Sequence, residues 1–253
     1  MKIEKTQTVQ VSDVATDRKL RLDALFSIFQ EMAVRHTQRV GLSLHELLES
    51  GHTWVLSRAV VRIEELPLLD ETIIVTTWSR GVRRFKGFRE FVIDRHGHAV
   101  IAASTLWVYL DTRKGRPTRV PDNYEARYGL VSDQAVDGAI EELLFPALDR
   151  PDYQLTVATR ISDYDVNGHV NNAVMLQYLE TAIYRYHGSE TAVAGISLVF
   201  QREIPLSVRE VTVAVQQIPE GCLFTIGAGE AQFVTGSATL QAVVSQDNRP
   251  HYD

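Results

Sequence analysis

The segment from Ser162 to Asn172 concentrates the side chains best suited to acid–base chemistry. Asp165, Asn167 and His169 occupy alternate positions in it. Alternate side chains of an extended chain point to the same side, which would bring a carboxylate, an amide and an imidazole together. An imidazole titrates near neutral pH, and beside a carboxylate it suits acyl transfer or hydrolysis.

A buried helix is predicted directly after this segment. Residues 173–186 are apolar almost all round, and Asn171 or Asn172 is a suitable N-cap. His169 therefore precedes a helix N-terminus, where we expect the backbone N–H groups of Val170 and Asn171 to bind a developing oxyanion. A purely structural alternative stays open, because Asp, Asn and Gly before a helix also serve as turn and capping residues.

The elements that must position this segment occur twice along the chain. Glu65-Leu-Pro-Leu and Glu203-Ile-Pro-Leu lie 138 positions apart. Each tetrapeptide ends a strand-like run and is followed by another, rich in Val, Ile and Thr. A hairpin follows in each half, with turns at His96-Gly97 and near Gly229. This internal similarity predicts two copies of one structural unit.

Each half also carries one long helix ahead of its strands. In the first half, apolar residues recur from Leu22 to Ala33 at the spacing of an amphipathic helix. The sequence thus predicts an α+β fold of two tandem hotdog units, each a central helix wrapped by a curved antiparallel sheet. We assign residues 1–121 to the N-terminal hotdog, 122–152 to an acidic connector and 153–253 to the C-terminal hotdog, which carries the catalytic residues.

Composition excludes several classes of protein. The 253 residues include 26 Lys and Arg against 32 Asp and Glu, and a net charge of −6 argues against a general nucleic-acid binder. The single cysteine, Cys222, excludes an internal disulfide and supplies no cysteine cluster for zinc. The sequence shows neither a signal- or transit-peptide pattern nor an apolar stretch long enough for a membrane span, so we expect a cytoplasmic protein.

The segment DYDVNGHVNNAVMLQYLE, which starts at Asp163, resembles the signature of the acyl-acyl carrier protein (acyl-ACP) thioesterases. These plant and bacterial enzymes end fatty-acid synthesis. The stretches that begin at Trp54, Ala102 and Val199 resemble strands of the same family, so the similarity spans most of residues 1–205. The resemblance implies two tandem hotdog halves and release of free fatty acid from acyl-ACP.

The resemblance also implies roles for single residues. The family's Asp-x-Asn-x-His falls on Asp165, Asn167 and His169, and its catalytic glutamate falls on Glu203. Glu203 and His169 would then act on water or the thioester, Asn167 would position the carbonyl or water, and Asp165 would orient His169 or its neighbours. Whether Glu203 activates water or attacks directly stays open. The plant enzymes carry a cysteine next, but here it is Ile204, so a cysteine–histidine–asparagine mechanism is untenable at that position.

The first half has no such constellation, because Ala15–Leu22 lacks the Asn-x-His pattern. One active site per chain is therefore expected, with the first half shaping the acyl pocket. The resemblance suggests Trp54, Phe85, Phe88 and Trp107 as lining residues, and the alternative for each is an ordinary core position. The sequence contains no phosphate loop, serine nucleophile elbow or nucleotide fingerprint, so we expect no cofactor and no metal.

Basic residues concentrate between Arg80 and Arg119. Ten bases face three acids there, for a net charge of +7. This concentration suits an acidic partner, and the resemblance implies acyl carrier protein. The expected docking residues are Arg83, Arg84, Lys86 and Arg89. The alternative is an ordinary solvated strand face.

Three other functions stay open. Single-hotdog acyl-coenzyme A thioesterases carry a similar Gly-His-Val-Asn-Asn segment, and a non-catalytic acyl-binding hotdog protein or a hotdog dehydratase would share the fold. The tandem repeat and the pairing of Asn167 with Glu203 disfavour the first. Chain length, saturation preference and oligomeric state, a homodimer included, also stay open.

Overall fold

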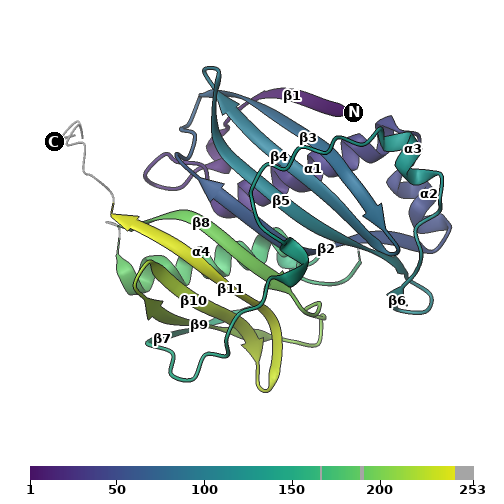
Figure 1. The fold of residues 1–253 in the computed structure, drawn as a ribbon. Coiled ribbons are helices and arrows are strands. Elements are labelled where there is room, and N and C mark those ends of the chain that lie inside the picture. Colours follow the sequence, from purple (N-terminus) through teal and green to yellow (C-terminus); the bar gives the residue numbers. More distant parts are fainter. Residues whose placement is uncertain (166, 189–190, 243–253) are drawn as a thin grey trace.

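One large antiparallel sheet organises the chain. The computed structural model describes residues 1–165, 167–188 and 191–242. Within them eleven strands form a single sheet in the order β1-β3-β4-β5-β2-β8-β11-β10-β9-β7, with β6 paired to β5. Figure 1 shows one long helix behind the strands of each half. The predicted α+β arrangement, a helix wrapped by antiparallel strands and repeated once, is confirmed.

The two halves contain corresponding elements. The first half comprises β1 (Lys2–Thr8), α1 (Leu22–Arg39), α2 (Leu44–Glu49), β2 (His52–Ile63), β3 (Thr72–Arg83), β4 (Lys86–Arg95), β5 (His98–Asp111) and β6 (Arg116–Pro117). The second half comprises β7 (Tyr153–Ala158), α4 (Asn172–His187), β8 (Thr191–Phe200), β9 (Glu210–Ile218), β10 (Gly221–Ala228) and β11 (Ala231–Ala242). None of the helices in these described ranges is long and apolar enough to cross a membrane.

The halves join edge to edge through β2 and β8. These strands pair antiparallel, with Arg58 opposite Val199 and Arg62 opposite Gly195. A side chain at position 195 would place its Cβ 3.2 Å from the carbonyl oxygen of Val61, so glycine permits the close approach. As a result, one continuous sheet carries both helices, and α1 packs against α4.

The hydrophobic core is also continuous between the halves. Met32 of α1 and Met175 and Leu176 of α4 are at most 2% exposed and belong to one cluster of packed side chains. Phe29 stacks on Phe91 with the ring centroids 4.5 Å apart. Because burial of one large apolar side chain stabilises the fold by about 1.5–3 kcal/mol, this shared core fixes the position of each helix relative to the other half.

The segment between the halves crosses the outer face of the first-half strands (Figure 1). It contains α3 (Tyr124–Tyr128) and a short 3-10 turn. The fully buried carboxyl of Glu90 accepts hydrogen bonds from the Ala135 N–H, at 2.9 Å, and from the Ser104 hydroxyl. Burial raises the pKa of Glu90, and these hydrogen bonds oppose that rise. Glu90 therefore anchors the segment to the sheet.

Candidate active site

A tight turn between β7 and α4 carries the predicted acid–base residues. The backbone N–H of Asp165 donates to the carbonyl oxygen of His169 at 2.9 Å, and the N–H of Gly168 donates back to Asp165 at 3.0 Å. Gly168 has φ 79°, which favours glycine. The prediction of an extended segment with alternating side chains is therefore wrong, because the chain closes on itself within five residues.

The turn brings Asp165 and Asn167 into direct contact. One Asp165 carboxylate oxygen accepts the backbone N–H of Asn167 at 2.8 Å, and the other accepts its side-chain amide at 3.3 Å. This is an Asx-type turn, in which a carboxylate holds the backbone two residues further on. Asp165 thus fixes the orientation of Asn167.

His169 meets Glu203 across the chain. Their Nε2 and Oε2 atoms lie 3.1 Å apart, with the two side chains 33% and 49% exposed. The contact follows from backbone pairing, since the Val170 N–H donates to Ile204 at 3.0 Å and His169 forms a bridge with Pro205. Ile204 is fully buried, so its side chain lies in the core. The structure therefore brings together two residues that are far apart in the sequence.

The expected oxyanion donors are already in use. The N–H of Val170 donates to Ile204, and that of Asn171 donates to the carbonyl oxygen of Asp163 at 2.8 Å. Asn171 is the N-cap, as one of the two predicted alternatives, and its side-chain oxygen accepts the Ala173 N–H at 2.9 Å. The prediction that Val170 and Asn171 bind the oxyanion is wrong, because a satisfied N–H does not stabilise a new charge.

A cavity of about 280 Å³ connects this site to the first half. The second half contributes Asp165, Asn167, His169, Val170, Asn171, Asn172 and Glu203 to its wall. The first half contributes residues of α1, including Gln30, and residues of β2, β4 and β5, including Trp54, Phe88 and Trp107. Phe85 is not part of this wall. Sequence patterns did not indicate Gln30, since its helix belongs to the other half.

Arg89 also lies on the cavity wall. Its side chain is 7% exposed, and its Nη1 lies 2.9 Å from Nδ1 of His36. Burial and the neighbouring Arg89 charge lower the pKa of His36 to about 3, so the imidazole is neutral and Nδ1 accepts the hydrogen bond. The prediction that Arg89 docks an acidic partner is wrong, because a guanidinium buried between α1 and the sheet is not accessible to another protein.

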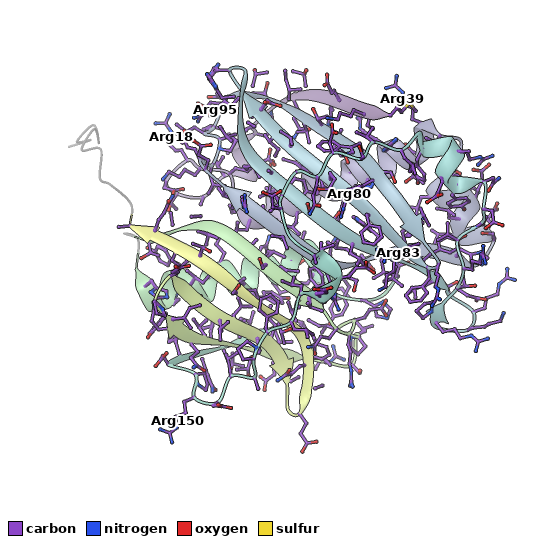
Figure 2. The ribbon with its side chains drawn as sticks, viewed as in Figure 1. Arg18, Arg39, Arg80, Arg83, Arg95 and Arg150 are labelled. Atoms are coloured by element: carbon purple, nitrogen blue, oxygen red, sulfur yellow. The ribbon has the colours of Figure 1, made fainter. Side chains whose placement is uncertain are left out.

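The other predicted docking residues lie at the β3–β4 turn. Lys86 contacts a Glu141 carboxylate oxygen at 2.8 Å, and Arg83 pairs with the other oxygen. Arg84, at the turn itself, is exposed. Figure 2 shows Arg83 and Arg80 on the same face, whereas Arg95 lies at the far end of the sheet. The basic residues are thus dispersed, and Glu141 neutralises part of their charge.

The first half contains the same turn without the acid–base residues. The Ala15 N–H donates to Lys19 at 3.0 Å, and the N–H of Arg18, with φ 66°, donates back to Ala15 at 2.9 Å. Ala15, Asp17 and Lys19 therefore stand where Asp165, Asn167 and His169 stand 150 positions later. The repeated backbone carries different side chains in the two halves.

Cys222→Ala should leave hydrolytic activity within about twofold of the wild type and lower stability by about 1 kcal/mol. Cys222 is fully buried in β10, and burial raises its pKa to about 11, so a neutral thiol faces the core. Thermal unfolding and a thioester assay measure both effects. A tenfold loss of activity in a stably folded variant would contradict this assignment.

The fold is that of a double-hotdog protein, and among the described residues the contact between His169 and Glu203 lies on a cavity that both halves line. The chain matches the acyl-ACP thioesterase N-terminal domain over residues 1–128 and the acyl-ACP thioesterase C-terminal domain over residues 149–232. It therefore belongs to the acyl-ACP thioesterase family.

Curated relatives support this placement. A chloroplastic acyl-acyl-carrier-protein hydrolase of Cuphea viscosissima is 27% identical over 235 residues, which cover 85% of this chain and 55% of that protein. A chloroplastic palmitoyl-acyl carrier protein thioesterase of Arabidopsis thaliana is 24% identical, over 89% of this chain and 58% of that protein. The chain thus spans about half the length of the curated relatives that it matches.

Solved structures agree in fold. The 12:0-ACP thioesterase from Umbellularia californica superposes with a TM-score of 0.84 and 20% identity, covering 95% of this chain and 97% of that chain. An acyl-ACP thioesterase from Bacteroides thetaiotaomicron gives a TM-score of 0.83 and 18% identity, covering 95% of this chain and 98% of that chain. At these identities the likeness establishes the double-hotdog fold.

Proposed function

We propose that the protein hydrolyses acyl-ACP thioesters and releases free fatty acid. The observation that carries this proposal is the 3.1 Å contact between His169 and Glu203 on the wall of a cavity that extends into the other half. A carboxylate next to an imidazole supplies general acid–base catalysis, and a mainly apolar cavity suits an alkyl chain. Membership of the acyl-ACP thioesterase family supports the same reaction.

In the proposed mechanism Glu203 and His169 act as one unit. The pair takes a proton from water as its oxygen bonds to the thioester carbonyl carbon, and the electron pair of the C=O bond moves to the carbonyl oxygen. When the C=O bond re-forms, the C–S bond breaks and the proton passes to the thiolate. Asn167, held by Asp165 at 2.8 Å and 3.3 Å, positions the carbonyl or the water. Glu203 is 49% exposed, which favours water activation over direct attack.

We further propose a division of labour between the halves. Residues 153–253 carry the chemistry, residues 1–121 provide the acyl pocket, and residues 122–152 connect them. The support is that α1, β2, β4 and β5 supply much of the cavity wall, while the turn before α4 supplies the acid–base pair. One active site per chain follows, because the equivalent turn at Ala15–Lys19 lacks the histidine.

Acyl carrier protein is the proposed partner, and relative rates on two substrates test this choice. The Cuphea viscosissima relative is named as an acyl-acyl-carrier-protein hydrolase. We expect kcat/KM for a carrier-linked acyl chain to exceed that for the same chain on coenzyme A at least tenfold, because docking stabilises only the first complex. The assay measures free fatty acid across a panel from octanoyl to stearoyl thioesters. Equal or reversed preference would favour an acyl-coenzyme A thioesterase instead.

Arg84→Glu should raise KM for acyl-ACP about three- to tenfold and leave KM for a small acyl thioester unchanged. Arg84 is exposed at the β3–β4 turn, and reversal of one surface charge weakens steering of an acidic partner. It is a cleaner target than Arg83 or Lys86, since both of these pair with Glu141.

The matched control for this experiment is Arg150→Glu. Arg150 is exposed near the end of the connector and lies beside the second half, away from Arg83, as Figure 2 shows. It changes the net charge by the same amount, so it separates docking at the turn from a general charge effect. Equal changes in KM from both variants, or equal effects on both substrates, would refute docking at the β3–β4 turn.

A further inference from the structure

Hydrolysis places negative charge on the thioester carbonyl oxygen, and the N-terminus of α4 offers few free donors for it. The N–H groups of Val170, Asn171 and Ala173 are all hydrogen-bonded. The N–H of Asn172, the first residue of α4, has no hydrogen-bond partner among the described residues. Stabilisation of an oxyanion generally uses more than one donor, so a second group is needed.

Gln30 of α1 is the side chain placed to supply it. It lines the same cavity as His169, Asn172 and Glu203. Its Nε2 lies 3.4 Å from Oδ1 of Asn171, the oxygen that accepts the Ala173 N–H. That oxygen is an acceptor, so Gln30 presents its NH₂ group to it. An amide NH₂ has two hydrogens, and the contact with Asn171 uses one.

The internal repeat supplies an independent comparison. With the 150-residue offset between the repeated turns, Asn172 corresponds to Leu22, and Gln30 corresponds to Glu180. The side chain of Gln30 extends from α1 to the N-terminus of α4, and that of Glu180 lies near the N-terminus of α1. Burial raises the pKa of Glu180, and the nearby backbone N–H of Leu22 opposes that rise. A protein carboxyl thus lies near the N-terminus of α1.

The residues that face the N-termini of α1 and α4 differ in chemistry. In the first half the residue on the facing helix, Glu180, is an ionisable carboxyl. In the second half the facing residue is a neutral amide that donates to Asn171, and the N–H of Asn172 remains available. A thioester carbonyl oxygen between the Gln30 amide and the N–H of Asn172 would accept two hydrogen bonds.

We infer that Gln30 is a further catalytic residue, whose side-chain amide binds the thioester carbonyl oxygen together with the backbone N–H of Asn172. This inference rests on the hydrolysis proposed above. As water adds to the carbonyl carbon, the C=O electron pair moves onto this oxygen, and both donors hold the resulting charge. When the C=O bond re-forms and the C–S bond breaks, the two hydrogen bonds weaken and the acid is released. The first half therefore contributes to the chemistry as well as to the pocket.

Gln30→Met and Gln30→Glu test the inference. Methionine keeps the length of the side chain without its donors, and glutamate reproduces the arrangement at α1. We expect kcat to fall about 10²-fold in Gln30→Met and further in Gln30→Glu, where a carboxylate opposes the oxyanion. Binding of a non-hydrolysable acyl thioether should change less than about threefold, because the thioether lacks the carbonyl oxygen to which Gln30 would donate.

The matched control is Glu180→Gln, at the equivalent position of the other helix, which should keep wild-type kcat. Circular dichroism and thermal unfolding confirm that each variant is folded. A folded Gln30→Met with wild-type kcat, or with a loss confined to KM, overturns the role of Gln30 while the proposed hydrolysis stands. A wild-type protein that releases no acid overturns the proposed function, and with it this role.

Discussion

Glu203→Gln should lower kcat for thioester hydrolysis by about 10³-fold with the fold intact. The amide cannot accept a proton, so the pair formed with His169 at 3.1 Å loses its base, and general acid–base catalysis is worth about 10²–10⁴-fold. Glu203 is 49% exposed, so the substitution should alter the free energy of unfolding by no more than about 0.5 kcal/mol. His169→Ala should cause a loss of similar size. Steady-state kinetics on acyl-ACP measures both.

Glu65→Gln is the matched control for this experiment. Glu65 begins the tetrapeptide that matches Glu203-Ile-Pro-Leu, 138 residues earlier, and its carboxylate pairs with Arg95. It should retain wild-type kcat. Because Glu203 and His169 act as one unit, the double variant should be little worse than either single variant. Wild-type kcat in Glu203→Gln, or equal losses in Glu65→Gln, would refute the assignment.

Glu180→Gln should stabilise the protein by as much as about 3 kcal/mol near pH 8. Burial, together with repulsion from Asp23, raises the pKa of Glu180 from its ordinary 4.5 to about 7. Ionisation of this carboxyl is therefore disfavoured at the contact between α1 and α4. A glutamine keeps the shape of the side chain without carrying a charge.

The pH dependence of this effect has a defined sign. A carboxyl whose pKa is higher in the folded state binds its proton more tightly there, so its contribution to stability is complete below the unfolded pKa of about 4.5. That contribution is lost as the pH rises through the folded pKa of about 7. The difference between Glu180→Gln and the wild type should therefore be small near pH 4 and grow up to neutral pH.

Urea unfolding at several pH values measures this difference directly. The free energy of unfolding should rise without any change in kcat, since Glu180 of α4 lies near the N-terminus of α1. A variant that is less stable than the wild type near pH 8, or a difference that does not depend on pH, would contradict the buried, charge-destabilised state of this carboxyl.

Much of the fold follows from the sequence because its signals are local and repeated. The two Glu-x-Pro-Leu tetrapeptides lie just beyond the ends of β2 and β8, and the apolar spacing after Leu22 and Asn172 marks the two helices. A hairpin turns at His96-Gly97, where both residues have positive φ. Such patterns depend on period and turn chemistry, which one segment carries by itself.

The errors arise where tertiary contacts decide the outcome. Arg89 has the charge of a docking residue, but its side chain points inward from β4 and is buried against His36. The N–H groups of Val170 and Asn171 are at a helix end, yet backbone pairing with Ile204 and Asp163 satisfies them. No local pattern reports these partners.

The contact between α1 and the catalytic turn was equally beyond local signals. Gln30 lies 141 positions from Asn171, and only the packing of α1 against α4 brings them together. Gln30 and Glu180 correspond by the 150-residue offset of the repeated turns. The two tetrapeptides lie 138 positions apart, so their pattern does not give this correspondence. Long-range pairing therefore defines the catalytic end of the cavity.

Product analysis in water enriched in the heavy oxygen isotope is the most direct test of the central claim, hydrolysis at the His169–Glu203 pair. We predict that the purified protein, incubated with acyl-ACP, releases free fatty acid that carries the heavy isotope, with one carrier thiol freed per acid. The folded Glu203→Gln variant should release almost none. Recovery of intact or unsaturated acyl thioester from the wild-type reaction, or equal acid release by the variant, would contradict the claim.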